Sequence, residues 1–221
     1  MNKNHLIIFA KYPREGSVKK RLAEKIGTKK ATDFYRACAE HTFSEAEKFG
    51  DCTIHIFYAN ESDDKDIRTW TKGHFFYKVQ AEGDVGMRMT DAFREVLKTK
   101  LLKKDAKNII IIGTDTPDIS SEILQDAFKK LAENEVVIGP ARNGGYYLLG
   151  MKKLHEELFR NIEWHTDSVF KTTMDIAQAS NLSVAVLDEL NDVDTEADVK
   201  IWMKKNGGHP LNFFTADLLK K

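Results

Sequence analysis

The chain has 221 residues, of which 42% are hydrophobic and 31% are charged, as expected for a globular domain that buries about 70% of its unfolded surface. Lysine plus arginine and aspartate plus glutamate number 34 each, so the formal net charge is zero, which argues against binding to nucleic acid or an anionic membrane. Residues 6–10 are the only apolar run near the N-terminus, and we expect neither a signal peptide nor a membrane span.

Apolar, β-branched runs alternate along the chain with segments of helical periodicity, which predicts a βαβ architecture. We expect strands at residues 6–10, 52–59, 75–79, 109–112, 136–139, 146–149 and 183–187. We expect helices at residues 29–49, 85–102, 121–132, 167–179 and 195–205, and a further helix that begins near Ser17. Because the sequence has no internal repeat, low-complexity tract or linker, we expect one domain over residues 1–221.

The loop after the first strand is rich in cations, namely Lys11, Arg14, Lys19, Lys20 and Arg21. Gly16 lets the backbone approach a ligand closely, and free N–H groups at the start of a helix near Ser17 favour an anion. A solvated basic helix start explains the composition equally well, but the position directly after the first strand favours phosphate binding. The loop is neither a P-loop nor a GxGxxG motif. A second glycine-containing segment, residues 83–88, ends at Arg88, which faces either an anionic ligand or solvent.

Four consecutive isoleucines at residues 109–112 suit a central strand that is buried on both faces. The segment Gly113-Thr114-Asp115-Thr116-Pro117-Asp118 ends that strand within one turn. Because ligands of open α/β sheets bind just beyond the carboxyl ends of the strands, we predict that Asp115 holds a divalent cation. Asp118 fits better as the cap of a helix that begins near Ser120.

Glycines and aromatic residues lie together in the segment Asn143-Gly144-Gly145-Tyr146-Tyr147, which joins two predicted strands. Asn-Gly is typical of a tight turn, so a plain hairpin explains it. Alternatively, the two glycines let the backbone approach a sugar or base while an aromatic ring packs against it. Trp164, expected at the end of a short helix, suits the core, and we also count it among the substrate-binding residues.

A second acidic cluster, residues 192–198, follows the last predicted strand. Two aspartates that each follow a strand could share a hard cation such as Mg²⁺, which takes its remaining ligands from water and substrate phosphates. We therefore predict that Asp194 is the second metal ligand. The alternative is an N-cap and acidic first turn for the following helix, although Asp194 with Ala197 makes a poor capping box.

Five motifs occur in order along nearly the whole chain: Phe9-Ala10-Lys11-x-Pro13-x-x-Gly16-x-Val18-Lys19-x-Arg21-Leu22, Gly83-Asp84-x-Gly86-x-Arg88-Met89, Gly113-Thr114-Asp115-x-Pro117-Asp118, Gly139-Pro140-Ala141-x-x-Gly144-Gly145-Tyr146 and Asp192-x-Asp194-Thr195-x-x-Asp198. The set resembles a bacterial and archaeal family of glycosyltransferase-like proteins, the radical-SAM/selenodomain-associated transferases, some of which are linked to arsenosugar biosynthesis. The resemblance implies the GT-A (nucleotide-diphospho-sugar transferase) fold, shared with molybdenum cofactor and 2-phospho-L-lactate guanylyltransferases. That fold is a single-domain α/β three-layer sandwich with a mostly parallel central sheet.

The resemblance also implies roles for individual residues. Asp115 and Asp194 would hold Mg²⁺ or Mn²⁺, and Asp115 would also be catalytic. The nucleotide-binding residues would be Lys11, Gly16, Lys19, Arg21, Arg88 and Thr114. The substrate-binding residues would be Gly144, Gly145, Tyr146 and Trp164. The sequence departs from the family in two places: Lys20 stands where threonine is expected, and Asn143 stands where aspartate precedes Gly-Gly-Tyr. Asn143, at the expected position of a catalytic carboxylate, cannot take a proton.

The sequence thus indicates a metal-dependent transferase that uses a nucleoside diphosphate sugar and a small-molecule acceptor. Nucleotidyl transfer from a nucleoside triphosphate remains the alternative, because it needs the same phosphate loop and cation. A nucleotide-binding protein with impaired catalysis is the third interpretation.

Two further features bear on cellular context and assembly. Cys38 and Cys52 have no metal-ligand spacing, which is typical of buried thiols in a reduced, cytoplasmic protein. The apolar residues after Gly208 are expected to pack on the body of the protein or against a second copy in a homodimer.

Overall fold

A computed structural model describes residues 3–98, 108–205 and 211 of the chain. Its helices, strands and 3₁₀ turns follow in the order β1 (Asn4–Ala10), α1 (Lys20–Ile26), α2 (Thr28–Phe49), β2 (Thr53–Tyr58), η1 (Glu61–Asp63), α3 (Asp64–Thr71), β3 (Phe76–Val79), α4 (Val85–Lys98), β4 (Asn108–Ile112), α5 (Ser121–Glu133), β5 (Val136–Pro140), β6 (Tyr146–Met151), η2 (Glu156–Phe159), α6 (Val169–Ala179), β7 (Val184–Val186) and α7 (Glu196–Lys205).

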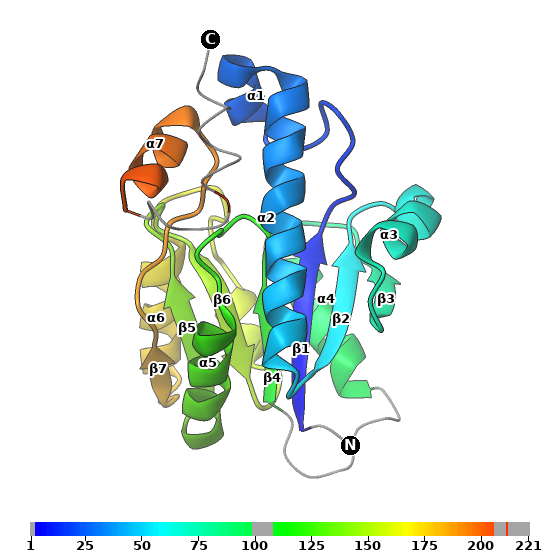
Figure 1. Cartoon of the computed structure of the whole chain (residues 1–221). Helices are drawn as coiled ribbons and strands as arrows, with labels where there is room; N and C mark the ends of the chain where they lie inside the picture. The colour runs from blue at the N-terminus through cyan, green and yellow to red at the C-terminus, as the bar shows by residue number, and fades with distance from the viewer. Residues whose placement is uncertain (1–2, 99–107, 206–210, 212–221) are drawn as a thin grey trace.

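The strands form one sheet in the order β3-β2-β1-β4-β6-β5-β7. Only β6 runs antiparallel to its neighbours β4 and β5 in this sheet, and the other strand pairs are parallel. Helices α2 and α5 pack on one face, and α4 and α6 pack on the other (Figure 1). The predicted three-layer α/β sandwich with a mostly parallel sheet is therefore confirmed.

The isoleucine run explains why β4 lies near the middle of the sheet. Ile110 and Ile112 join the apolar cluster under α2 and α5, whereas Ile109 and Ile111 join the cluster under α4 and α6. Each of the four side chains is at most 4% exposed. A strand with apolar side chains on both faces is stable only where both faces are covered, and β4 meets that condition because α2 and α5 cover one face of the sheet while α4 and α6 cover the other.

Several boundaries differ from those expected. The helix expected near Ser17 begins at Lys20 because residues 14–17 form a turn, in which the Ser17 N–H donates to the Arg14 carbonyl at 3.0 Å. The sequence pattern did not indicate α3, and Trp164 lies in a turn before α6 rather than at a helix end. Residues 99–102 of one expected helix, and the tail after Gly208 apart from residue 211, lie outside the described residues.

Within residues 3–98 and 108–205, no helix is both long and apolar enough to cross a bilayer.

Two histidines are buried side by side in β1 and β2. His5 is 3% exposed and His55 is 5% exposed, and the Nδ1 atom of His5 lies 3.0 Å from the Nε2 atom of His55. The His55 ring also stacks on Phe76. Burial, with a smaller contribution from His5, lowers the pKa of His55 to about 3. His55 is therefore neutral in the folded protein at neutral and mildly acidic pH.

This histidine should make the protein less stable in mild acid. In the unfolded chain His55 has a pKa near 6.5 and takes up a proton as the pH falls below that value, whereas in the folded chain it does not until about pH 3. The stability contributed by neutral His55 is thus present above pH 6.5 and is lost as the pH falls, by about 2 kcal/mol between pH 7 and pH 5. Urea denaturation at both pH values should show this loss, and His55→Gln should reduce it. An equal loss in the variant would contradict the assignment.

Candidate functional site

A pocket of about 660 Å³ opens at the carboxyl ends of β1 and β4. Its lining comes from seven regions of the chain. They are the end of β1 with the loop that follows it, Tyr35 on α2, Gln80 after β3, the start of α4, the end of β4 with residues 113–115, the start of β6, and Asp194. A pocket at this edge of the sheet is where α/β proteins of this kind bind ligands. The predicted site residues that line it are Lys11, Lys19, Arg21, Arg88, Thr114, Asp115, Tyr146 and Asp194.

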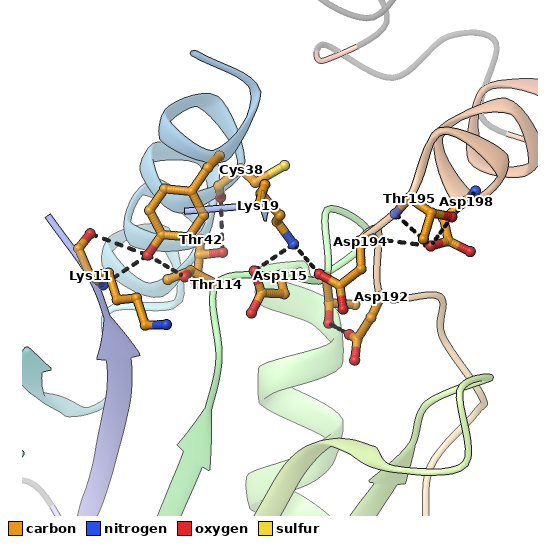
Figure 2. Close-up of polar contacts among 12 residues, drawn as sticks. Lys11, Lys19, Cys38, Thr42, Thr114, Asp115, Asp192, Asp194, Thr195 and Asp198 are labelled. Atoms are coloured by element: carbon orange, nitrogen blue, oxygen red, sulfur yellow. Dashed lines mark hydrogen bonds and ion pairs between the residues drawn. The ribbon is translucent and has the colours of Figure 1, made fainter. Parts of the chain in front are cut away.

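Lys19 joins the two predicted metal ligands. Its Nζ atom lies 2.6 Å from Asp115 Oδ1 and 2.8 Å from Asp194 Oδ1, so the two aspartates face each other across one ammonium group (Figure 2). The Lys19 side chain is 2% exposed, whereas those of Asp115 and Asp194 are 49% and 43% exposed. Burial alone would lower the pKa of Lys19, but the two carboxylates overcome that effect and raise it.

The backbone at Lys19 adopts a conformation that is unfavourable for a side chain with a Cβ. Lys19 has φ 47° and ψ 46°, in the left-handed region, and directly precedes α1. Such a conformation costs about 1–2 kcal/mol for a residue other than glycine, so surrounding contacts must hold it. The ion pairs with Asp115 and Asp194, together with buried Val18 and Leu22 on either side, supply those contacts.

Tyr35 on α2 links the two loops that form the pocket. Its hydroxyl accepts from the Lys11 backbone N–H at 2.8 Å and from Thr114 Oγ1 at 3.1 Å. Burial, with the charge of Asp115, raises the pKa of Tyr35 to about 12, so the hydroxyl keeps its proton at neutral pH. The sequence indicated Tyr35 only as part of the apolar face of a helix, and no local signal identifies its hydroxyl as a link between loops.

Asp192 anchors the acidic segment to the rest of the site. Its carboxylate accepts from Thr116 Oγ1 and, at 3.1 Å, from Asn143 Nδ2. The Val193 N–H donates to the Asp115 carbonyl at 3.0 Å, which ties this segment directly to the loop after β4. Burial first, and then the charges of Asp115 and Asp194, raises the pKa of Asp192 to about 6. These contacts place Asp194 beside Asp115.

The start of α7 corrects one interpretation of the acidic cluster. The Asp198 carboxylate accepts from the backbone N–H and the hydroxyl of Thr195, and the Asp198 N–H donates back to Thr195 Oγ1 at 3.2 Å. Thr195 and Asp198 therefore form the reciprocal capping box that Asp194 and Ala197 could not form. The Thr-x-x-Asp spacing was the signal for it. Because Asp198 caps the helix, the Asp194 carboxylate is left to pair with Lys19.

The segment Asn143-Gly144-Gly145 makes the turn of the β5–β6 hairpin and does not line the pocket. Asn143 Oδ1 accepts from the Gly145 N–H at 2.9 Å while its amide donates to Asp192. An aspartate at position 143 would face Asp192 with a second negative charge, which Asn143 avoids. A Cβ on Gly144 would lie 2.0 Å from the Asp167 carbonyl oxygen, so Gly144 allows the hairpin to touch the segment before α6.

Other predicted residues lie away from the pocket lining or already have partners. Trp164 packs edge-on to Tyr146 and stands against Gly86, where a Cβ would meet its ring at 2.4 Å. Gly16, with φ 76°, lies in the exposed turn before α1 and does not line the pocket. Arg14 is paired with Asp63 and Asp66.

Two further titratable residues lie away from the pocket. Asp118 does not cap α5, because that role falls to Ser120, whose side chain accepts from the Ile123 N–H. Instead, Asp118 Oδ1 accepts from the Trp202 indole at 2.5 Å. His165 is exposed in the turn before α6. Neither residue lines the pocket.

Carboxylate oxygens are suitable ligands for Mg²⁺ or Mn²⁺, and Asp115 and Asp194 bring two half-exposed carboxylates together. Among the described residues, no group of three or more His, Cys, Asp or Glu side chains has metal-binding geometry. The donor set therefore fits a cation that takes most of its ligands from water and phosphate, and not one enclosed by protein.

Cys38 on α2 carries a buried thiol (Figure 2). Burial raises its pKa to about 12, which makes it a poor nucleophile.

Comparison with known proteins agrees with this architecture. A candidate nucleotide-diphospho-sugar transferase from Desulfovibrio desulfuricans G20 superposes with a TM-score of 0.89 and 28% identity, over 99% of this chain and 94% of the other. The 4-diphosphocytidyl-2C-methyl-D-erythritol synthase from Anaerococcus prevotii DSM 20548 has a TM-score of 0.58 and 12% identity, over 90% and 95% of the chains. CMP:2-keto-3-deoxy-manno-octonic acid synthetase in complex with CTP has a TM-score of 0.55 and 10% identity, over 92% and 98%. No curated protein matches the sequence significantly.

The fold is thus that of the nucleotide-diphospho-sugar transferases. Within it, the chain belongs to the family described as "Uncharacterized protein conserved in bacteria (DUF2064)", whose model matches residues 42–166.

Proposed function

We propose that this protein is a metal-dependent, glycosyltransferase-like enzyme that binds a nucleoside diphosphate sugar at the pocket beside β1 and β4. The observation that carries the proposal is the meeting of Asp115, Asp194 and Lys19, from three distant parts of the chain, within that pocket. A cation-binding pair of carboxylates next to lysine and arginine side chains suits a diphosphate and its metal ion. The 28% identity to a candidate transferase of the same fold supports the same class.

The pocket lining supports a division of roles. Asp115 and Asp194 would hold Mg²⁺ or Mn²⁺, and Lys11, Lys19 and Arg21 would bind the diphosphate. Arg88 and Thr114 would complete the nucleotide side together with the backbone at Gly16. Tyr146 would face the substrate. Gly144 and Gly145 would support Tyr146 indirectly through the hairpin turn, and Trp164 would support it by packing its ring against the tyrosine.

The proposed chemistry is stabilisation of the charge that develops on the leaving diphosphate. When bound, the divalent cation would supply part of the positive charge. Lys11, Lys19 and Arg21 would bind and orient the same phosphates by charge-assisted hydrogen bonds fixed before the reaction. Asn143 cannot act as a base and here positions Asp192.

Nucleotidyl transfer is the second candidate, in which a sugar phosphate or cofactor precursor attacks a nucleoside triphosphate. The observation that favours it is the shared fold with two nucleotidyl-transferring synthases, one of them in complex with CTP. Asn143 also keeps open a third interpretation, a nucleotide-binding protein with impaired catalysis. The link to arsenosugar biosynthesis remains a prediction from the sequence resemblance.

A thermal-shift panel with Mg²⁺ or Mn²⁺ tests the proposal. Nucleoside diphosphates, nucleoside triphosphates and nucleotide sugars are compared, and ligands that stabilise the protein are then incubated with candidate acceptors. Preferential stabilisation by a nucleotide sugar, followed by nucleoside diphosphate release, supports glycosyl transfer. Pyrophosphate release from a triphosphate supports the second candidate. Binding without turnover, unchanged by Asn143→Asp, supports the third, and no stabilisation by any nucleotide overturns the proposal.

A further inference from the structure

Lys19 occupies the position that the proposed cation would need. Its ammonium group contacts the Oδ1 atoms of both Asp115 and Asp194, the two carboxylates that the proposed function assigns to the metal. A cation placed between the same two oxygen atoms would overlap the ammonium group. Metal binding between the aspartates therefore requires Lys19 to leave them.

The charges around Lys19 favour such an exchange. One ammonium group carries a single positive charge, so it neutralises only one of the two carboxylates that it contacts. A divalent cation would neutralise both Asp115 and Asp194. The released ammonium group would then need a new partner, because a buried charge without one is costly.

A phosphate ligand in the pocket would give Lys19 that new partner. Lys19 is buried among groups that line the pocket, beside Ser17, Lys20 and Arg21, where the proposed diphosphate would lie. Its flexible four-carbon stem lets the ammonium group turn from the carboxylates to phosphate oxygens without a change of the fold. Buried Val18 and Leu22 on either side hold the backbone of Lys19 between the two groups.

We propose that Lys19 is a built-in counter-cation, which fills the metal position of the free protein and moves to the phosphates when a metal–diphosphate complex enters. The inference rests on the proposed function, and it adds that metal and diphosphate bind together. The free metal should bind weakly, because it must displace an ammonium group that is paired with both carboxylates. Lys19 thus limits the binding of a cation that arrives without phosphate.

Binding of Mn²⁺ alone, followed by the electron paramagnetic resonance signal of the free ion, tests the inference. Lys19→Met removes the ammonium group and keeps an apolar stem of similar length, so it should tighten Mn²⁺ binding about ten-fold or more. Lys20→Met is the matched control, since Lys20 is exposed, lines the same pocket and forms no ion pair with either aspartate. Its Mn²⁺ affinity should stay within about two-fold of the unmodified protein. An unchanged or weaker affinity in Lys19→Met would overturn the inference.

A second measurement needs no loss of Lys19 and so avoids a folding defect. The ¹⁵Nζ resonance of Lys19 in the unmodified protein, assigned with Lys19→Arg, should be little changed by Mg²⁺ and should shift when Mg²⁺ and pyrophosphate are added together. If the Lys19 resonance does not shift when Mg²⁺ and pyrophosphate are added together, the proposed movement of Lys19 is wrong. The two proposals can fail separately. If the protein binds a nucleotide sugar but Lys19→Met leaves the Mn²⁺ affinity unchanged, the proposed function stands and the movement of Lys19 is wrong. If Lys19→Met tightens Mn²⁺ binding but the protein binds no nucleotide, the competition between Lys19 and the metal stands and the proposed function is wrong.

Discussion

Replacing Asp115 with alanine is expected to abolish the metal-dependent part of nucleotide stabilisation. Asp115 is one of only two carboxylates among the described residues that pair with Lys19, so its loss leaves the cation with a single protein ligand. Loss of an indirect partner of a metal ligand costs about 10–100-fold in affinity, and loss of the ligand itself should cost about 100-fold or more. Calorimetric titration of nucleotide with and without Mg²⁺ measures the change.

The variant Asp118→Asn is the control for this experiment. Asp118 belongs to the same loop but does not line the pocket, and asparagine keeps an oxygen that can accept from the Trp202 indole. Metal-dependent binding should be unaffected. If Asp115→Ala retains the full metal-dependent shift, Asp115 is not part of the site and the proposed function loses its main observation.

A methyl group at position 144 should have the largest effect on stability. Gly144 has φ 86°, and an added Cβ would lie 2.0 Å from the Asp167 carbonyl oxygen, which is backbone and cannot turn aside. The hairpin and the segment before α6 would have to separate, weakening the hydrogen bond from the Phe170 N–H to the Gly144 carbonyl. We expect Gly144→Ala to lower the free energy of unfolding by about 3 kcal/mol or more, equivalent to about 10 °C in Tm.

Gly16→Ala is the control that measures the cost of a positive φ without a steric clash. Gly16 also has a positive φ, 76°, but an added Cβ would meet nothing within 4 Å. Its substitution should cost only the conformational term, about 1–2 kcal/mol. Urea denaturation of both variants measures the difference. Equal losses would show that the contact between the hairpin and the Asp167 segment is not tight in solution.

Local sequence was a good guide to the fold because each strand and helix depends on neighbouring residues. The isoleucine run predicted a strand buried on both faces, and Ile109 to Ile112 lie in β4 with apolar contacts on each side. Turn signals were equally local, as Asn143-Gly144 at the β5–β6 hairpin shows. The Thr195-x-x-Asp198 capping box could also have been identified from its spacing alone.

Side-chain partners were beyond the reach of local patterns. Arg14 is positively charged and lies in the same loop as Lys19, yet it pairs with Asp63 on η1 and Asp66 on α3, outside the pocket. The sequence was compatible with Trp164 either on the substrate side or in the core. In the folded protein its ring packs edge-on to Tyr146 and against Gly86, where a side chain would collide with it. Asp118 pairs with Trp202, a residue 84 positions away, and not with the helix that follows it.

The sequence by itself thus determined the strands and most of the helices, since period and turn chemistry act over a few residues, but it did not indicate α3. Only the tertiary structure decided that Lys19 lies between Asp115 and Asp194, the latter 175 positions away along the chain. The pairing of these charges depends on the distances between them. Those distances become short only when the folded sheet brings the ends of β1 and β4 and the segment after β7 to one edge.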